Sequence, residues 1–244
     1  MWNKINQIRR FYRVSVWRTL LFNFYMLPFS QAIKLPILLT RNVRFYNLSG
    51  KVILKGRVKP AMIRFGFLGE DNLYWNSEKI ILNISGCLVL THNIHFGNGV
   101  LIRVERNANI EIEENVSISN KVKIIAYKSI LIRQNTRIAW EVQILDTTFH
   151  YIRNLGDMTF GELNAPIIIG ENNWIGNRTS IMKGTKTPNY TIVASGSLVN
   201  KDLNVPEYSI VAGTPVKLIK TGVYRVLSKE EKEIINSLKK NSLI

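Results

Sequence analysis

The 244-residue chain contains three histidines, His92, His95 and His150, and these side chains are the first to consider for chemistry. Imidazole changes its charge near neutral pH, so a histidine can act as the general base that removes a proton from an attacking hydroxyl. Asp146 precedes His150 by four residues and could orient that imidazole through its second ring nitrogen. An aspartate there could equally be a turn residue at the entrance of a loop. The residue types alone leave both roles of Asp146 open.

A metal site is the main alternative use of these histidines. His92 and His95 form an HxxH pair, but on a flat strand this spacing points the two rings to opposite faces. Cys87 is the one cysteine, which excludes a disulfide framework and a multi-cysteine zinc site and fits a reducing compartment. We therefore expect no metal.

Charge is distributed very unevenly along the chain. The formal net charge is +16, and no Asp or Glu occurs before Glu70, while thirteen Lys and Arg fall within the first 69 residues. A basic block of this kind seeks phosphate, on nucleic acid, on anionic lipid or on an anionic substrate. A nucleic-acid binder should carry its basic and aromatic residues across the main domain, so we expect no nucleic acid.

A six-residue repeat dominates the middle of the chain. One aliphatic or small residue recurs every six positions, and a small or polar residue usually stands four positions beyond it. The first series of repeat positions is Ile169, Ile175, Ile181, Thr187, Val193 and Val199, followed at the fourth positions by Asn173, Thr179, Thr185, Thr191 and Ser197. An earlier series contains Ile112, Ile118, Ile124 and Ile130, then Ile132, Ile138 and Ile144 after a two-residue shift.

Three such hexapeptides can form one triangular coil, in which each supplies a short strand and a corner. The aliphatic residue points inward, and coils of about 18 residues stack at the usual strand spacing of about 4.8 Å. The repeat thus predicts an all-β, parallel β-helix over residues 41–222. An ordinary β-sandwich with this spacing by chance is the alternative.

Other segments extend or interrupt this domain. Residues 1–40 read as a basic, aromatic helical extension, which either lies on an anionic membrane surface or packs on the rest of the protein. Its longest apolar stretch, residues 19–28, is too short to span a bilayer. Residues 145–166 interrupt the repeat and form a long loop, where function often sits. Residues 223–244 should form a short C-terminal helix, with a capping box at Ser228 and Glu231.

Three segments together resemble the hexapeptide-repeat acyltransferases: WIGNRTSIMKG from Trp174, IVASGSLVNKDL from Ile192 and IVAGTPVKLIK from Ile210. The segment IAWEVQILDTTFH, which ends at His150, resembles the branch that O-acetylates sugars of capsule, O-antigen or other surface polysaccharides. The resemblance implies a left-handed β-helix, a homotrimer, acetyl-CoA as donor, a sugar or polysaccharide acceptor, and His150 as the base. Asn120 is a weak candidate for stabilising the oxyanion.

The resemblance also implies which positions bind coenzyme A. Asn177 follows Trp174 and Gly176 in the WIGN motif, and with Ser195 it stands where the family contacts the pantetheine arm. Asn200 and Lys201 stand near the adenosine end, and Lys217 and Lys220 match the basic residues of the family that bind the phosphates. The sequence departs from the family pattern at Pro188 and Ala194, where glycine is common. It also has Ser195 where the family typically has alanine, which leaves the donor preference open.

Several alternatives remain at this stage. On the same fold the chain could be an N-acyltransferase that acts on an amino sugar or an amino acid. It could also be a non-enzymatic binding module for anionic polymers, or a scaffold. We expect a cytoplasmic protein, peripheral at the inner face of the membrane if residues 1–40 contact lipid.

Overall fold

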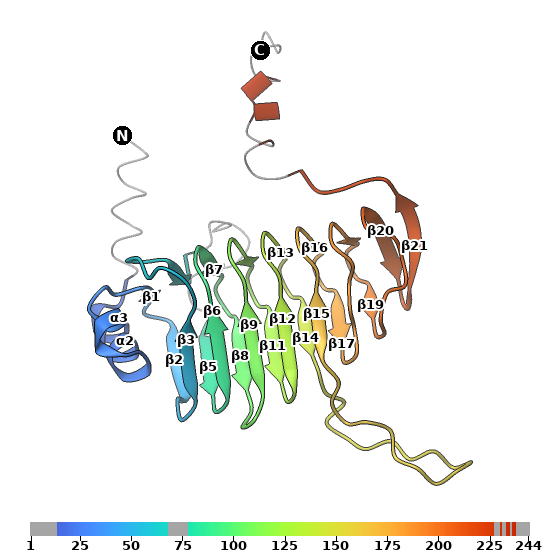
Figure 1. The fold of residues 1–244 in the computed structure, drawn as a ribbon, viewed down its shortest axis with the longest axis horizontal. Coiled ribbons are helices and arrows are strands. Elements are labelled where there is room, and N and C mark those ends of the chain that lie inside the picture. Colours follow the sequence, from blue (N-terminus) through green and yellow to red (C-terminus); the bar gives the residue numbers. More distant parts are fainter. Residues whose placement is uncertain (1–13, 68–77, 227–229, 231–232, 235, 238–244) are drawn as a thin grey trace.

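The computed structural model describes residues 14–67 and 78–226, together with residues 230, 233–234 and 236–237. In this part of the chain, short parallel strands wind into a left-handed β-helix with three flat faces (Figure 1). The chain visits the faces in a fixed order, from a nine-stranded face to a seven-stranded face and then to a five-stranded face. We call the bends between them the first corner (nine to seven), the second corner (seven to five) and the third corner (five to nine).

The strands of each face are as follows. The nine-stranded face holds β1 (Ile37–Leu39), β4 (Ile63–Phe65), β7 (Ile94–Phe96), β10 (Ser117–Ile118), β13 (Arg137–Ile138), β16 (Trp174–Ile175), β18 (Ile192–Val193), β20 (Ser209–Gly213) and the antiparallel β21 (Val216–Thr221). The seven-stranded face holds β2 (Val43–Asn47), β5 (Ile80–Ile84), β8 (Leu101–Val104), β11 (Lys123–Ala126), β14 (Gln143–Leu145), β17 (Ser180–Met182) and β19 (Leu198–Val199). The five-stranded face holds β3 (Lys51–Leu54), β6 (Cys87–Leu90), β9 (Asn109–Ile112), β12 (Ser129–Ile132) and β15 (Ile167–Ile169).

The register confirms the meaning of the repeat. On the nine-stranded face Ile118, Ile138, Ile175 and Val193 are aligned partners from strand to strand. All four are at most 2% exposed, so the column of aliphatic residues forms the core. The fourth-position residues of the C-terminal coils are buried as well, and their hydroxyls bond to main-chain carbonyls, as Thr185 does to Val199 at 3.1 Å. A small polar side chain at the corner therefore satisfies a buried backbone group.

Coil length is less uniform than the repeat predicts. Partners advance by 18 residues from Ile175 to Val193, but by 20 from Ile118 to Ile138. The additional residues at the second corner lie at Tyr127 and Lys128, between β11 and β12. They account for the two-residue shift between Ile130 and Ile132, since both side chains point inward from the same four-residue strand.

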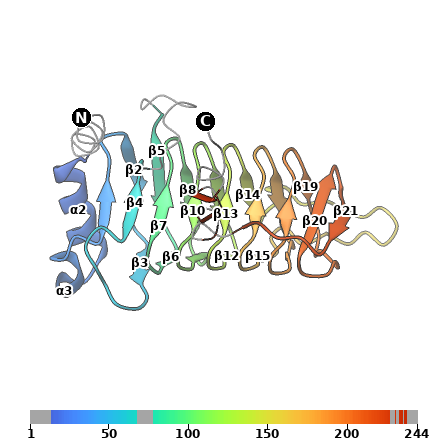
Figure 2. The ribbon, with the colours of Figure 1, turned by 90° about the horizontal axis from the view of Figure 1, so that it is seen from above.

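The N-terminal end of the β-helix is covered by two helices, α2 (Val16–Met26) and α3 (Phe29–Ala32) (Figure 2). Thr19 and Asn23 of α2 bond to the main chain of the edge strand β1, so that strand is not left open. The first strand begins at Ile37, four residues before the expected start of the β-helix at residue 41. No helix in the described ranges has the length and hydrophobicity to cross a bilayer.

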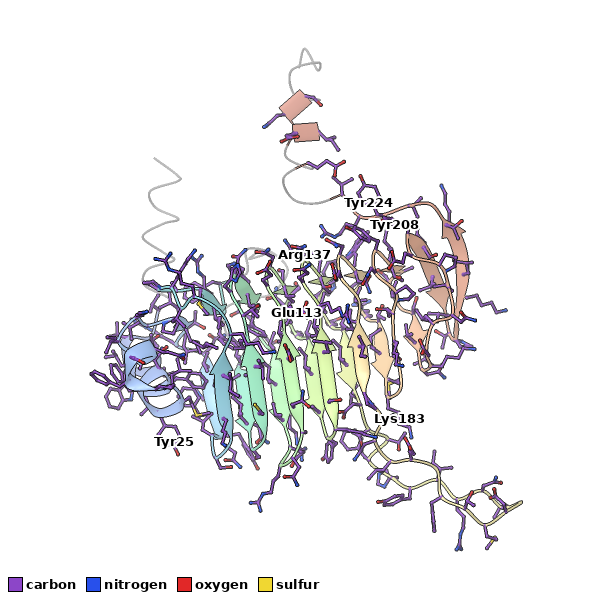
Figure 3. All side chains as sticks on the ribbon, viewed as in Figure 1. Tyr25, Glu113, Arg137, Lys183, Tyr208 and Tyr224 are labelled. Atoms are coloured by element: carbon purple, nitrogen blue, oxygen red, sulfur yellow. The ribbon has the colours of Figure 1, made fainter. Side chains whose placement is uncertain are left out.

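The C-terminal segment returns along the third corner. Tyr190 and Tyr208 stack with ring centroids 4.5 Å apart, and Tyr224 packs edge-on against both at 6.3 Å (Figure 3). Arg225 then donates to the carbonyl of Asn135 at 3.2 Å. Residues 1–13 of the expected N-terminal helix lie outside the described residues. In the expected C-terminal segment 223–244, residues 223–226 are not helical and residues 230, 233–234 and 236–237 are. The expected capping-box residues Ser228 and Glu231 lie outside the described residues.

Candidate active site

The expected loop over residues 145–166 is a two-stranded arm that leaves the β-helix at the second corner, between β14 and β15 (Figure 1). Its two sides pair antiparallel at Thr147 with Asn164 and at Arg153 with Phe160. Near the tip, the Arg153 guanidinium lies 4.9 Å from the centre of the Phe160 ring. The arm is therefore an ordered hairpin that projects from the body.

Large apolar side chains cover the arm, although it is surrounded by solvent in a single chain. Leu155 is 84% exposed and Tyr151 is 68% exposed, and the group also includes Phe149, Ile152, Met158 and Phe160. Clusters of this kind usually mark a contact surface. The arm thus presents an apolar surface that a single chain leaves uncovered.

The base of the arm is held to the body on both sides. On the outgoing side, the carboxylate of Asp146 is fully buried and accepts from the backbone N–H groups of Tyr127 at 2.7 Å and Lys128 at 2.8 Å. Burial raises the pKa of Asp146 above its ordinary value, although these N–H donors act in the opposite direction. On the returning side, the Lys183 ammonium donates to the carbonyl of Glu162 (Figure 3).

His150 lies on the outgoing side of the arm, and its side chain is exposed. A turn fixes its backbone, because the Thr148 hydroxyl donates to the His150 carbonyl at 3.1 Å. Among the described residues, no hydrogen bond or ion pair engages its imidazole. Both carboxylate oxygens of Asp146 are already bonded to main-chain N–H groups, so the structure does not bring Asp146 and His150 together as a pair.

The other histidines and Asn120 have local structural partners. The His92 imidazole lies 3.2 Å from the carboxylate of Glu114, and His95 contacts the side-chain carbonyl of Asn93 at 3.1 Å. Burial, with Arg64 and Arg137 nearby, lowers the pKa of His95. Asn120 is 1% exposed, and its side-chain carbonyl accepts from the N–H of Asn98 at 2.7 Å. No group of three or more His, Cys, Asp or Glu side chains in the described ranges could hold a metal ion.

The first corner carries the residues expected to contact the pantetheine arm. The Ser195 hydroxyl donates to the side-chain carbonyl of Asn177 at 2.6 Å, which links two successive coils. A Cβ atom at Gly176 would lie only 2.5 Å from the backbone nitrogen of Ser195, so glycine is needed for this close approach. Trp174, just before this corner, is 43% exposed. The corner thus offers a narrow track of backbone and small polar groups.

The residues expected at the adenosine end and at the phosphates lie at the C-terminal end of the β-helix. Lys201 and Lys217 line one open hollow, together with Asp202, Leu203, Asn204, Val205, Val211, Val216 and Leu218. Two ammonium groups around an open hollow suit phosphate, although Asp202 places one negative charge at the same rim. Asn200 precedes Lys201 at the end of β19 and is exposed. Lys220 stands on β21 outside the lining of this hollow.

The candidate base and the residues expected to contact the pantetheine arm therefore lie at different corners. His150 belongs to the arm at the second corner, whereas Asn177 and Ser195 lie at the first corner. A single chain does not bring the candidate base and the pantetheine track together. Sequence reasoning missed the anchoring role of Lys183, although this residue stands inside the WIGNRTSIMKG segment.

The chain is similar in sequence to several known acetyltransferases. No protein-family model matches the chain. The chain is 26% identical over 136 residues to the putative lipopolysaccharide biosynthesis O-acetyl transferase WbbJ of Escherichia coli, a match that spans 52% of this chain and 68% of that protein. It is 30% identical over 116 residues to the galactoside O-acetyltransferase of Escherichia coli, across 46% of this chain and 54% of that protein. Other curated relatives include an N-acetyltransferase.

The solved structure of the polysialic-acid-specific acetyltransferase NeuO matches with a TM-score of 0.60 at 18% identity, over 85% of this chain and 88% of that one. This similarity supports the fold alone. The homologues are hexapeptide-repeat acetyltransferases, which confirms the resemblance seen in the sequence.

Proposed function

We propose that this chain, whose homologues are hexapeptide-repeat acetyltransferases, transfers an acetyl group from acetyl-CoA to a sugar hydroxyl of a saccharide or surface polysaccharide. The observation that carries the proposal is the position of His150, exposed on an ordered arm whose base is fixed by Asp146 and Lys183. An exposed imidazole without a competing partner is free to engage an acceptor hydroxyl.

In this reaction His150 acts as the general base. Its imidazole takes the proton of the acceptor hydroxyl, whose oxygen forms the new ester bond to the acetyl carbon as the thioester C–S bond breaks. The proton held by His150 then passes to the leaving sulfur, which departs as the thiol of coenzyme A. Proton transfer by a positioned base contributes a factor of about 10² to 10⁴ to the rate.

Acetyl-CoA would lie along the first corner, with its thioester near the imidazole. Asn177 and Ser195 offer polar atoms to the pantetheine arm, and Lys201 and Lys217 offer positive charge to the phosphates. Trp174, Gly176, Asn200 and Lys220 complete the proposed donor site. The four groups Asn177, Ser195, Lys201 and Lys217 are partly or fully exposed and therefore accessible to a ligand.

We further propose that the complete site forms between two copies of the chain in a homotrimer. His150 and the Asn177–Ser195 pair occupy different corners of one β-helix, so the arm of one copy must reach the first corner of a neighbour. The exposed apolar side chains of the arm, such as Tyr151 and Leu155, support this arrangement, since a neighbour would cover them. Asp146 is then a positioning residue that fixes the base of the arm.

An N-acyltransferase with the same fold is the second candidate, because relatives of both kinds occur. Purified protein is incubated with acetyl-CoA and matched acceptors that carry either a hydroxyl or an amine, and release of free thiol is followed. Ester products lose their acetyl group in mild alkali, whereas amides retain it. We expect alkali-labile product that depends on His150. Thiol release only with amine acceptors would favour the N-acyltransferase, and no release with any acceptor would favour a binding module.

A further inference from the structure

The helix α2 has an unusual polarity. Its polar side chains Thr19 and Asn23 face the body, where they are at most 3% exposed. Phe22 is buried beside them in the core and Met26 is partly buried, but the other large apolar side chains of α2 face solvent, and this exposed surface continues onto α3 and the residue after it. The exposed set, between 36% and 72% accessible, is Val16, Trp17, Leu20, Leu21, Phe24, Tyr25, Phe29 and Ile33. We call this set the α2–α3 face.

The inward polar side chains have a clear structural reason. Asn23 donates to the carbonyl of Ile37 at 2.7 Å and accepts from the N–H of Ile37 at 3.2 Å. Thr19 accepts from the N–H of Leu39 at 3.1 Å, so the two side chains replace a neighbouring strand along β1. In the described ranges these outward apolar side chains remain at least 36% exposed, so no comparable structural role accounts for them.

The surroundings of the α2–α3 face are basic. Lys34, Arg41 and Arg44 are exposed near it in sequence, and Arg18 lies on α2 itself. A hollow beside the helix, lined by Tyr25 and Met26, has Lys51 at its edge. The sequence contains no Asp or Glu before Glu70, so no carboxylate of this segment offsets the positive charge. A surface that is aromatic, and whose own segment of the sequence is basic and has no acidic residue, complements an anionic lipid headgroup layer.

We propose that the α2–α3 face docks the protein on the surface of an anionic lipid bilayer. Trp17 and Tyr25 would lie at headgroup depth, where amphipathic aromatic rings are favoured, while Phe24 and Phe29, whose rings are 5.9 Å apart, enter the acyl boundary. The eleven residues of α2 lie in the interface and do not cross the bilayer. This inference is independent of the proposed acetyl transfer.

The location of the α2–α3 face also fixes the orientation of the bound protein. The helices cover the N-terminal end of the β-helix, whereas the arm and β20–β21 lie toward the opposite end (Figures 1 and 2). A protein docked through α2 and α3 therefore contacts the membrane with the N-terminal end of its β-helix, and the opposite end points away from the lipid. Lys201 and Lys217 then face away from the lipid and stay accessible to soluble ligands.

The test is vesicle flotation with the full chain, using phosphatidylcholine vesicles and vesicles that also contain phosphatidylglycerol. We expect strong binding to the second kind at low salt and weak binding to the first. Replacing Trp17 and Phe24 by serine should reduce binding by at least about tenfold, since much of the buried apolar area is lost. The matched control is Ile219→Ser, at a side chain 62% exposed on β21 at the other end, which should bind like the unmodified chain.

Charge-reversal variants test whether the basic residues near the α2–α3 face contribute to vesicle binding. Arg41→Glu combined with Arg44→Glu should weaken binding to anionic vesicles by roughly fivefold or more per side chain, while Lys123→Glu on β11 has little effect. Circular dichroism checks that each variant is folded. Equal binding by the Trp17/Phe24 variant and the unmodified chain would overturn the proposal. Concentration-dependent self-association through the same residues, with no vesicle binding, would also overturn it and identify the face as a protein interface.

Discussion

The buried carboxylate of Asp146 accepts a hydrogen bond from the backbone N–H of Tyr127 at 2.7 Å. Tyr127 belongs to the two additional residues that lengthen the coil between β11 and β12. The N–H groups at this corner point toward the arm, and Asp146, the first residue of the arm after β14, satisfies them. The longer coil and the arm are therefore built as one unit, with Asp146 as the junction.

Asp146→Ala should mainly destabilise the protein. The substitution leaves the N–H groups of Tyr127 and Lys128 without an acceptor in a buried position, at a cost of roughly 2–5 kcal/mol in the free energy of unfolding. Urea denaturation measures this loss. In the active enzyme, the pH dependence of kcat should keep its shape because Asp146 does not contact the imidazole. A shifted pH profile with unchanged stability would show instead that Asp146 orients His150.

The same carboxyl gives a pH-dependent contribution to stability. Burial raises the pKa of Asp146 from its ordinary 3.8, so the folded chain holds this proton more tightly than the unfolded chain. The contribution of this group to the free energy of unfolding therefore decreases as the pH rises from the ordinary pKa through the raised one. Asp146→Asn should remove this decrease, which urea unfolding at a series of pH values will detect. Identical pH slopes for the variant and the unmodified chain would contradict the assignment.

His150→Ala should lower kcat by about 10² to 10⁴, because the general base is lost. The affinity for acetyl-CoA and the thermal midpoint should hardly change, since the His150 side chain is exposed and makes no bond with the described residues. His92→Ala, which removes a surface pair with Glu114, is the matched control and should keep its activity. Full activity of the His150 variant would exclude it as the base.

Charge reversal at Lys201 or Lys217 should weaken acetyl-CoA binding, because both side chains line the same hollow. We expect an increase in Kd of about tenfold for each, and a strong dependence on salt. Lys123→Glu on the middle of the seven-stranded face serves as the control. Equal Kd values for all three variants would show that the phosphates of acetyl-CoA do not bind in this hollow.

Asn23→Leu should destabilise the N-terminal end of the β-helix. The leucine would leave both the N–H and the carbonyl of Ile37 unpaired at a buried strand edge, a loss of roughly 2–4 kcal/mol. The neighbouring Phe24→Ser, at an exposed position, should be nearly neutral in stability. Thermal unfolding of the two variants separates the polar contact from a general effect on the helix.

The sequence predicted the fold well because the six-residue period is a direct consequence of its geometry. Ile175 and Val193 are aligned and buried as the period requires. The two-residue shift of the repeat also signalled a longer coil, but it could not show that the additional residues, Tyr127 and Lys128, lie at the second corner. The roles of Thr19 and Asn23 were also missed, since their spacing along a helix does not reveal that a strand edge needs them.

The candidate site was predictable only in part. The position of His150 on a projecting segment followed from the interruption of the repeat, but the pairing of that segment into a two-stranded arm depends on contacts such as Thr147 with Asn164. The expected pairing of Asp146 with His150 relied on spacing along the chain. Spacing cannot show that buried N–H groups nearly twenty residues earlier compete for the same carboxylate.

Calorimetric titration with acetyl-CoA, coenzyme A and ADP shows whether this chain binds the proposed donor, and it requires no knowledge of the acceptor. We predict saturable binding of acetyl-CoA near one per chain at moderate salt, weakened by charge reversal at Lys201 and Lys217 and unaffected by His150→Ala. Absence of binding, or binding that disappears with salt equally for all three ligands, would contradict an acetyl-CoA-dependent transferase and leave a basic binding module in its place.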